Sequence, residues 1–370
     1  MKCHQQTDRF YAQVGNGVAD HQQWERPEDN TLPRPSYVVG AGTTQSGGAD
    51  VMGETAAALA AASIVFKATV LFFTRLLLTS LPLSDIHICI DVTYSNYLLS
   101  NATSLYALAK NNPGTYNAAV TDGAQFYSSS HWEDEMAHAA AWLAKAYEGN
   151  TVADTYLSES EAYLDHSSII WALEWDDKRG LVNFILYEMT KKDIYKNNLI
   201  NFFKSDWLFN GGTELSQPGL AFRLQWGSLR YAANAAYLAL LSAKENINSE
   251  SYKTFAKSQV DYFLGLSSHN NQFSYVVGFG TNYPKQPHHK AASCPYASDD
   301  PNCGWNYFNI DQDNPHTLYG ALVGGPKNQA GTDYEDRRTD YVSNEVACDY
   351  NAGFTGALAG LKYFGLSPPA

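Results

Sequence analysis

Apolar residues recur at helical spacing in six stretches of the chain, which predicts a protein built mostly of α-helices. These stretches are residues 53–67, 132–147, 177–191, 226–244, 252–264 and 351–364. They contain few β-branched runs, and the first is rich in alanine. Long loops rich in Gly, Pro, Asn and Asp separate them at 15–48, 267–314 and 324–340. Loops of this length are usually functional, so we expect helices whose loops gather at one end around a cleft.

Residues 68–101 interrupt this pattern with a segment rich in Leu, Phe and Ile. A membrane span is excluded, because Lys67, Arg75, Pro82 and Asp85 break the apolar run well short of the roughly 20 residues that a spanning helix needs. An additional core hairpin and an error in the gene model, such as a translated intron, are both open. We favour the second, because typical sequence resumes at Ala102. No linker divides residues 1–370 elsewhere, so we expect one domain with an atypical insertion at 68–101.

Charge and composition narrow the possible partners. The formal net charge of −13 over 370 residues argues against nucleic acid, which requires clustered Lys and Arg, and suits a neutral substrate. The chain contains 25 Tyr and 8 Trp, more than a core requires. Aromatic rings stack well on sugars, although core packing accounts for most of them. No signal peptide precedes the polar residues at the start, which indicates either a cytosolic protein or a missing start.

The five cysteines show neither a CxxC pair nor the spacing of zinc ligands. We therefore expect no metal site and no cofactor. Cys294 and Cys303 flank a loop rich in Pro, Asp and Asn and could form a disulfide across it. The odd number of cysteines leaves at least one free thiol.

Three polar clusters could carry chemistry. Glu345 lies just ahead of the last predicted helix, where a carboxyl group shielded from water could keep its proton and act as a general acid; an exposed loop glutamate is the alternative. His288 and His289 lie in an extended loop, so at most one of them faces a given pocket. His288 could donate a hydrogen bond to a substrate hydroxyl, whereas metal binding is disfavoured for want of a partner at ligand spacing. The third cluster, residues 20–29, pairs His21 with Trp24, and Trp132 and Trp226 stand at the starts of predicted helices. Each alone is more often a packing residue, but together they suit a sugar-binding cleft.

These stretches resemble glycoside hydrolase family 9, the endoglucanases, over nearly the whole chain outside residues 68–101. The C-terminal signature of that family has two aromatic residues around an Asp, then the catalytic Glu and an Asn, and it is matched at Tyr334, Asp336, Tyr341, Glu345 and Asn351. The histidine signature is matched at Ser274, Gly280, Asn282, Pro287 and His288. Lys290 replaces the usual arginine, which keeps the charge but loses the planar fork that binds a sugar with two hydrogen bonds.

The resemblance implies an all-α fold, the (α/α)6 barrel, and hydrolysis of β-1,4-glucans with inversion of the anomeric centre. It implies that Glu345 is the general acid, that Asp336 supports the catalytic site and that His288 contacts the substrate at the cleavage point. The residues expected to bind substrate are His21, Trp24, Trp132, Trp226, Lys290 and Tyr350. We also expect a secreted monomer that binds β-1,4-glucan or cello-oligosaccharide and no membrane, with its signal peptide missing from these 370 residues.

An inverting glycosidase needs a second carboxylate, about 6.5 to 9.5 Å from the acid, to activate water. In this family an Asp-Ala-Gly-Asp motif supplies it, and the sequence contains no such motif; nothing around Asp20 or Asp50 marks either as a substitute. We therefore expect a barrel that is incomplete at its N-terminus and hydrolyses glucan slowly. The alternatives are a non-hydrolytic carbohydrate-binding remnant and a product that does not fold.

Overall fold

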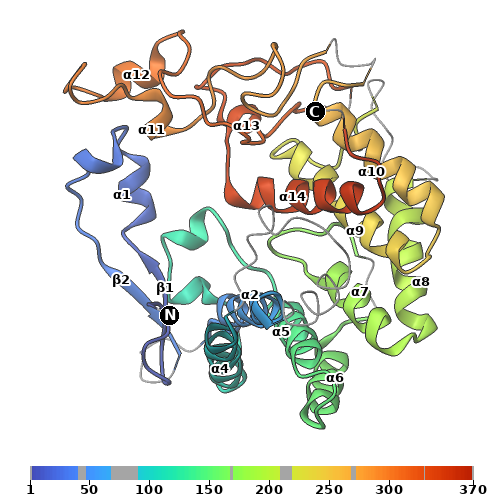
Figure 1. The fold of residues 1–370 in the computed structure, drawn as a ribbon. Coiled ribbons are helices and arrows are strands. Elements are labelled where there is room, and N and C mark those ends of the chain that lie inside the picture. Colours follow the sequence, from blue (N-terminus) through green and yellow to red (C-terminus); the bar gives the residue numbers. More distant parts are fainter. Residues whose placement is uncertain are drawn as a thin grey trace. The chain divides into compact units, whose positions relative to one another are not determined.

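The computed structural model describes residues 2–40, 47–67, 91–166, 170–208, 219–267, 272–328 and 330–368. It divides into two compact units. Unit 1 comprises Met1–Val18, Pro33–Ser168 and Asp176–Thr190, and unit 2 comprises Ala19–Leu32, Ile169–Trp175 and Lys191–Ala370. Helices are the main regular structure in both units, and the strands of the described residues form one hairpin (Figure 1). The all-α prediction is confirmed.

Unit 1 combines this hairpin with a group of packed helices. Strands β1 (Phe10–Val14) and β2 (Ser36–Val39) pair antiparallel, with Phe10 opposite Val39. The helices are α2 (Ala49–Lys67), α4 (Val92–Lys110), α5 (Glu133–Ala146), α6 (Val152–Tyr163) and α7 (Arg179–Thr190), with the 3-10 turns η3 (Tyr116–Ala118) and η4 (Gly123–Gln125). Helix α2 packs on α4 and α5, and α5 packs on α6 and α7 (Figure 1).

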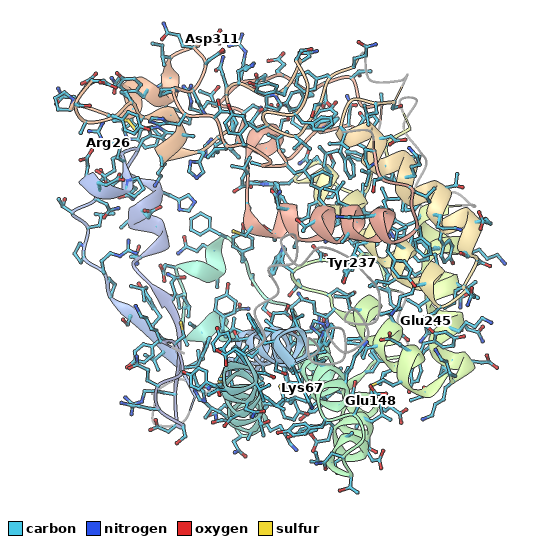
Figure 2. All side chains as sticks on the ribbon, in the orientation of Figure 1. Arg26, Lys67, Glu148, Tyr237, Glu245 and Asp311 are labelled. Carbon is cyan, nitrogen blue, oxygen red and sulfur yellow. A yellow bond between two sulfur atoms is a disulfide. The ribbon has the colours of Figure 1, made fainter. Side chains whose placement is uncertain are left out.

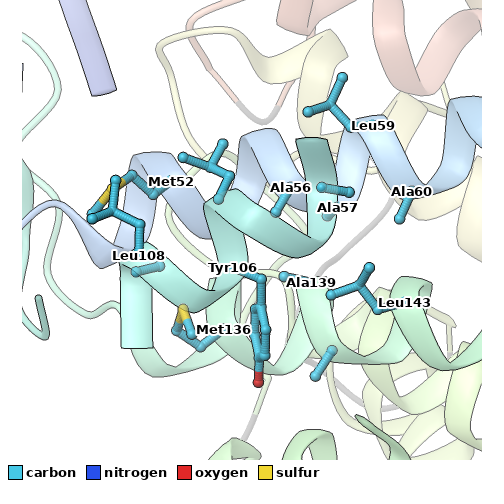
Figure 3. Packing of buried hydrophobic residues seen from close by; sticks show 14 of the residues in the cluster. Met52, Ala56, Ala57, Leu59, Ala60, Tyr106, Leu108, Met136, Ala139 and Leu143 are labelled. Atoms are coloured by element: carbon cyan, nitrogen blue, oxygen red, sulfur yellow. The ribbon is translucent and has the colours of Figure 1, made fainter. Parts of the chain in front are cut away.

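The core of unit 1 consists largely of small side chains on α2, α4 and α5. Figure 3 shows alanines of α2 and α5 between larger residues such as Met52, Leu108 and Leu143. A Cβ atom on Gly53 would lie 3.0 Å from the carbonyl oxygen of Glu135, so α2 and α5 approach closely at this glycine. Of the described helices, α2 is long and apolar enough to cross a membrane, but half of its most apolar 18-residue stretch is buried inside the protein. Packing against α4 and α5 therefore accounts for its composition.

Helix α4 begins inside the stretch that breaks the sequence pattern. The Asp91 carboxylate accepts a hydrogen bond from the backbone N–H of Tyr94 at 2.8 Å and so caps the helix. Leu98 is buried in the core, and the hydroxyl of Ser95 donates to the carbonyl oxygen of Ser63 on α2 at 2.7 Å. Helical packing thus begins before Ala102, the position expected from the sequence. The remaining residues of the predicted insertion, 68–90, lie outside the described residues.

Unit 2 is organised around helix α9 (Ser228–Lys244), which packs on α10 (Ser249–Phe263) and α14 (Cys348–Tyr363) (Figure 1). Its other helical segments are α8 (Asp193–Phe202) with the π-helical turn η5 (Phe203–Leu208), the short helices α11 (Lys290–Ser293), α12 (Trp305–Asn309) and α13 (Tyr341–Asn344), and the 3-10 turn η1 (Pro27–Asp29). The last residues of α1 (Gly17–His21) also belong to it.

Three glycines on one face of α14 let it approach α9 closely. Cβ atoms at Gly353, Gly356 and Gly360 would lie 2.1, 2.6 and 2.9 Å from the nearest atoms of α9. Contacts this short do not occur, so larger residues at these positions would push the two helices apart. The start of α14, which follows Glu345, is thereby held in place.

All six predicted helical stretches are helices, and they correspond to α2, α5, α7, α9, α10 and α14. Helices α4, α6 and α8 were not predicted. In α6 only Ala153 and Ser160 are buried, so its sequence carries almost no apolar stripe to reveal it.

The predicted disulfide between Cys294 and Cys303 is present. Cys3 and Cys348 are free and exposed, and Cys89 lies outside the described residues. The disulfide closes a loop in unit 2 between α11 and α12.

Candidate active site

Glu345 lies in unit 2 between α13 and α14, in a short extended connection. Its backbone forms an isolated parallel bridge with His288, and the N–H of His288 donates to the carbonyl oxygen of Asn344 at 2.8 Å. The next residue, Val346, forms an antiparallel bridge with Val323. The backbone therefore joins the two segments that carry the sequence signatures, although they are more than fifty residues apart in the chain.

The carboxylate of Glu345 is held through one of its two oxygens. Atom Oε2 accepts hydrogen bonds from the indole Nε1 of Trp226 at 2.7 Å and from the hydroxyl of Tyr350 at 2.9 Å. When the group is protonated, both bonds persist with Oε2 as the carbonyl oxygen, which leaves the proton on Oε1. Three residues predicted for the active site thus converge at one carboxyl group.

The two donors differ in their exposure. Tyr350 is buried, and a Cβ on Gly227, where φ is +69°, would lie 3.1 Å from its ring and hydroxyl. Trp226 is 43 % exposed, and its ring centroid lies 5.3 Å from that of the exposed Tyr341. Trp226 therefore retains an accessible aromatic surface while its indole N–H holds Glu345.

The imidazole of His288 has a defined tautomer. Atom Nδ1 lies 2.8 Å from the carbonyl oxygen of Arg338. A carbonyl oxygen only accepts, so Nδ1 carries the proton, and Nε2 of the neutral ring is an acceptor. Burial lowers the pKa of His288, while the bond to Arg338 and the charge of Glu345 oppose this shift. In the neutral ring Nε2 can therefore only accept a hydrogen bond, whereas the sequence suggested that His288 donates one.

Trp24 packs against the His288 ring, with 5.1 Å between the ring centroids and an edge-to-face angle of 65°. It is only 4 % exposed, and its Nε1 donates to the hydroxyl of Ser293 at 2.9 Å. Phe308 adds a third ring, 6.0 Å from His288. Trp24 was predicted to bind substrate, but in this arrangement its surface is covered and it supports the histidine.

Asp336 holds the turn that precedes His288. Its two oxygens accept hydrogen bonds from the backbone N–H groups of Lys285 and Gln286 at 2.6 and 3.0 Å. Burial raises the pKa of Asp336, and the two amides oppose this shift. Both carboxylate oxygens of Asp336 are therefore engaged by the turn that leads to His288.

Lys290, the residue that replaces the expected arginine, is paired within unit 2. Its Nζ lies 2.8 Å from the Asp20 carboxylate and donates to the Asp20 carbonyl oxygen at 2.6 Å. The residue before it, His289, accepts the N–H of Ala292 at 3.1 Å and so caps α11. The amine therefore ties α1 to α11, and Asp20 is engaged as its partner.

Of the two remaining predicted residues, His21 lies close enough to His288 for its charge to help lower the pKa of His288, whereas Trp132 belongs to unit 1. His21 is exposed at the end of α1 in unit 2. Trp132 lies in unit 1 at the start of α5, with its ring 5.9 Å from Tyr163. The second candidate for a water-activating base, Asp50, is buried in unit 1, where it accepts the backbone N–H groups of Val51 and Tyr116. Among the residues that the structure describes, no group of three His, Cys, Asp or Glu side chains is placed to hold a metal ion.

Two arginines that support the site were missed. Arg230, 5 % exposed on α9, lies 3.0 Å from the Asp349 carboxylate, and its guanidinium carbon is 5.3 Å from the Tyr350 ring centroid. Arg338 contributes the carbonyl oxygen that binds His288. Both lie beside residues that the sequence did single out, but a charged residue is expected at the surface, and nothing local indicates that these two are buried.

A family model described as glycosyl hydrolase family 9 matches residues 1–358 of this chain. The chain therefore belongs to glycosyl hydrolase family 9. It is 36 % identical over 369 residues to Endoglucanase A of Bacillus pumilus, which covers 97 % of this chain and 50 % of that protein. The chain thus spans about half the length of this curated relative.

Solved structures share the fold. The endoglucanase of the termite Nasutitermes takasagoensis matches with a TM-score of 0.84 and 41 % identity, over 98 % of this chain and 76 % of that one. The cellulase Cel9M of C. cellulolyticum in complex with cellobiose matches with a TM-score of 0.77 and 34 % identity, over 98 % and 75 % of the two chains. These likenesses confirm the predicted fold class, an all-α fold of the (α/α)6-barrel type.

Proposed function

We propose that this protein hydrolyses β-1,4-glucan chains and that Glu345 is the general acid. The observation that carries the proposal is the capture of Oε2 by Trp226 and Tyr350 at 2.7 and 2.9 Å, which leaves the proton of the carboxylic acid on Oε1. The similarity to endoglucanases, and to a cellulase that binds cellobiose, supports a cello-oligosaccharide as substrate.

The proposed reaction proceeds by inversion. Glu345 Oε1–H protonates the glycosidic oxygen while the bond from that oxygen to the anomeric carbon breaks, and positive charge develops on the sugar ring. A water molecule attacks the anomeric carbon from the opposite face and gives its proton to a second carboxylate. Nε2 of His288 accepts a hydrogen bond from a sugar hydroxyl at the cleavage point, and the exposed ring of Trp226 stacks on a sugar.

No sequence motif in these 370 residues identifies the second carboxylate, which would activate the water. Asp20 is paired with Lys290, and Asp50 is buried and bound to two backbone amides. We therefore propose that the 370 residues by themselves hydrolyse glucan slowly, because an acid without its base retains only part of the rate acceleration. The alternative function is carbohydrate binding without turnover, which the exposed aromatic surface of Trp226 would permit.

The test is the release of reducing sugar from carboxymethylcellulose. The proteins compared are the 370-residue chain, the same chain joined to the Asp-Ala-Gly-Asp region of a relative, and the Glu345→Gln variant of each. We expect the joined form to be much faster and Glu345→Gln to abolish its activity. Glu335→Gln is the matched control, because the Glu335 carboxylate is 71 % exposed and pairs only weakly with Arg337.

Activity that survives Glu345→Gln would overturn the assignment of the acid. Binding of cellotetraose by the joined form, measured by calorimetry, with no release of reducing ends would favour the non-hydrolytic alternative.

We also propose that the protein is secreted. The disulfide between Cys294 and Cys303 supports this, because such bonds persist in oxidising compartments. Thiol labelling of the natural protein with and without prior reduction tests the proposal. Cys294 and Cys303 should react only after reduction, and labelling of both without reductant would contradict it.

A further inference from the structure

The segment of residues 294–314, which follows α11, has little regular structure apart from α12, and two buried arginines outside it, Arg26 and Arg338, hold it in place. Arg26, labelled in Figure 2 beside this segment, donates from Nη1 and Nη2 to the carbonyl oxygens of Pro295, Asp300 and Pro301 at 3.0, 2.9 and 2.8 Å. All three acceptors lie within the loop that the disulfide closes. Arg26 therefore fixes the first half of the segment.

Arg338 holds the second half in the same way. Its Nε donates to the side-chain oxygen of Asn314 at 2.8 Å, and its Nη atoms donate to the carbonyl oxygens of Tyr307, Ile310 and Gln312. This half carries Phe308, whose ring packs on both Trp24 and His288. Arg338 thus shapes part of the aromatic wall around the histidine.

The burial of Arg338 is costly. Arg338 is 2 % exposed, its side-chain donors go to the Asn314 amide and to backbone carbonyl oxygens, and no carboxylate among the described residues lies within ion-pair distance. Burial accordingly lowers the pKa of the guanidinium, with Asp336 and Asp311 opposing the shift from further away. A buried charge of this kind is tolerated only where its donors are matched by acceptors in fixed places, so the position of Arg338 is tightly defined.

Two routes connect Arg338 to His288. The carbonyl oxygen of Arg338 accepts the Nδ1 proton of His288 at 2.8 Å. The side chain of Asn314, whose oxygen binds Arg338, donates from Nδ2 to the carbonyl oxygen of Pro287 at 3.0 Å. The first route sets the ring, and the second sets the backbone that precedes it.

We propose that Arg338 is a positioning residue that fixes His288 in the Nδ1–H tautomer, so that Nε2 faces the substrate as a hydrogen-bond acceptor. The proposal rests on the proposed function only in assigning the ligand of Nε2, a sugar hydroxyl. The tautomer and its dependence on Arg338 are properties of the protein without substrate. A lysine would keep the charge but lose the planar fork that reaches four acceptors.

The test uses the full chain labelled with 15N-histidine, in which His288→Gln assigns the His288 ring by the loss of its signals. In the native chain we expect one set of His288 ring signals with the proton on Nδ1. Arg338→Lys and Arg338→Gln should give both tautomers or exchange between them. Arg26→Lys is the matched control, because Arg26 is also buried, at 7 % exposure, and its guanidinium holds the same segment without a bond to His288.

The outcomes separate cleanly. A native ring protonated on Nε2, or an Arg338→Lys ring that keeps the native signals, overturns the proposal. If Arg338→Gln fails to fold, Arg338→Lys and the native tautomer still decide. An equal change in Arg26→Lys would also overturn it, because any loosening of the segment would then suffice.

A kinetic measurement adds the link to function. In the form joined to the Asp-Ala-Gly-Asp region, Arg338→Lys should lower kcat by about 10- to 100-fold, the range expected for misplacement of a group by a fraction of an ångström to an ångström. KM should change less. Unchanged kcat with an altered tautomer would show that the proposed function of His288 is wrong while the positioning role stands.

Discussion

Replacement of Asp336 by asparagine should destabilise the chain through the loss of one specific hydrogen bond. The two oxygens of Asp336 each accept one backbone N–H, from Lys285 at 2.6 Å and from Gln286 at 3.0 Å. Asparagine has one oxygen and one amide nitrogen, so it can satisfy one of these N–H groups and opposes the other with a donor.

The expected magnitude follows from this count. A hydrogen bond to a charged group contributes about 1.5 to 3 kcal/mol, and an unsatisfied buried N–H costs about 1 to 3 kcal/mol. Burial raises the pKa of Asp336, which shows that its ionised form is disfavoured there. Removing this charge therefore offsets part of the loss. We expect Asp336→Asn to lower the free energy of unfolding by about 2 to 3 kcal/mol.

Asp333 offers a closely matched control. It also binds two consecutive backbone N–H groups, of Lys327 at 2.9 Å and Asn328 at 3.2 Å, but both bonds go to the single oxygen Oδ1. Asparagine can keep both, so Asp333→Asn removes the same charge and should cost less than about 1 kcal/mol.

The assay is urea unfolding of the two variants and the native chain at pH 7, followed by tryptophan fluorescence and far-ultraviolet circular dichroism. Equal losses of stability in the two variants would refute the reasoning, because they would show that the charge and not the second oxygen matters. A loss in Asp333→Asn larger than in Asp336→Asn would refute it as well.

Three further predictions concern the same unit. Trp226→Phe keeps an aromatic ring but removes the donor to Glu345, so kcat/KM of the form joined to the Asp-Ala-Gly-Asp region should fall about tenfold; unchanged hydrolysis of cellotetraose would contradict this. Burial lowers the pKa of His288 in the folded chain below its ordinary value of 6.5. The unfolded chain therefore takes up a proton at His288 first, and the folded state loses stability as the pH falls below 6.5. His288→Gln should therefore show a shallower loss of urea resistance between about pH 6.5 and 5, and a slope equal to the native one would count against the shift. Replacement of Cys294 and Cys303 together by serine opens a loop of sequence separation 9 and should cost about 2 to 3 kcal/mol, measured as a lower thermal midpoint, whereas an unchanged midpoint would argue against the bond.

The local sequence determined the helices that carry a clear apolar pattern. Helices α5 and α9 bury most of their residues, among them many alanines, and their spacing is visible in the chain. Glu345 could also be located, because it stands just before a helix in an aromatic and acidic context and matches a long family signature. Helix α6 could not, since its buried face is nearly absent from the sequence.

The tertiary structure alone decided which of these residues meet and which are accessible. Trp24 and Trp226 look alike in the sequence. In the structure Trp24 is 4 % exposed and packs against the His288 ring, whereas Trp226 is 43 % exposed and donates a hydrogen bond to Glu345. Trp226 reaches Glu345 from a position 119 residues away. Periodicity reports which face of an element is apolar, but the identity of the opposing surface depends on packing between distant segments. For the same reason the burial of Arg338, and through it the tautomer of His288, could be derived only from the folded chain.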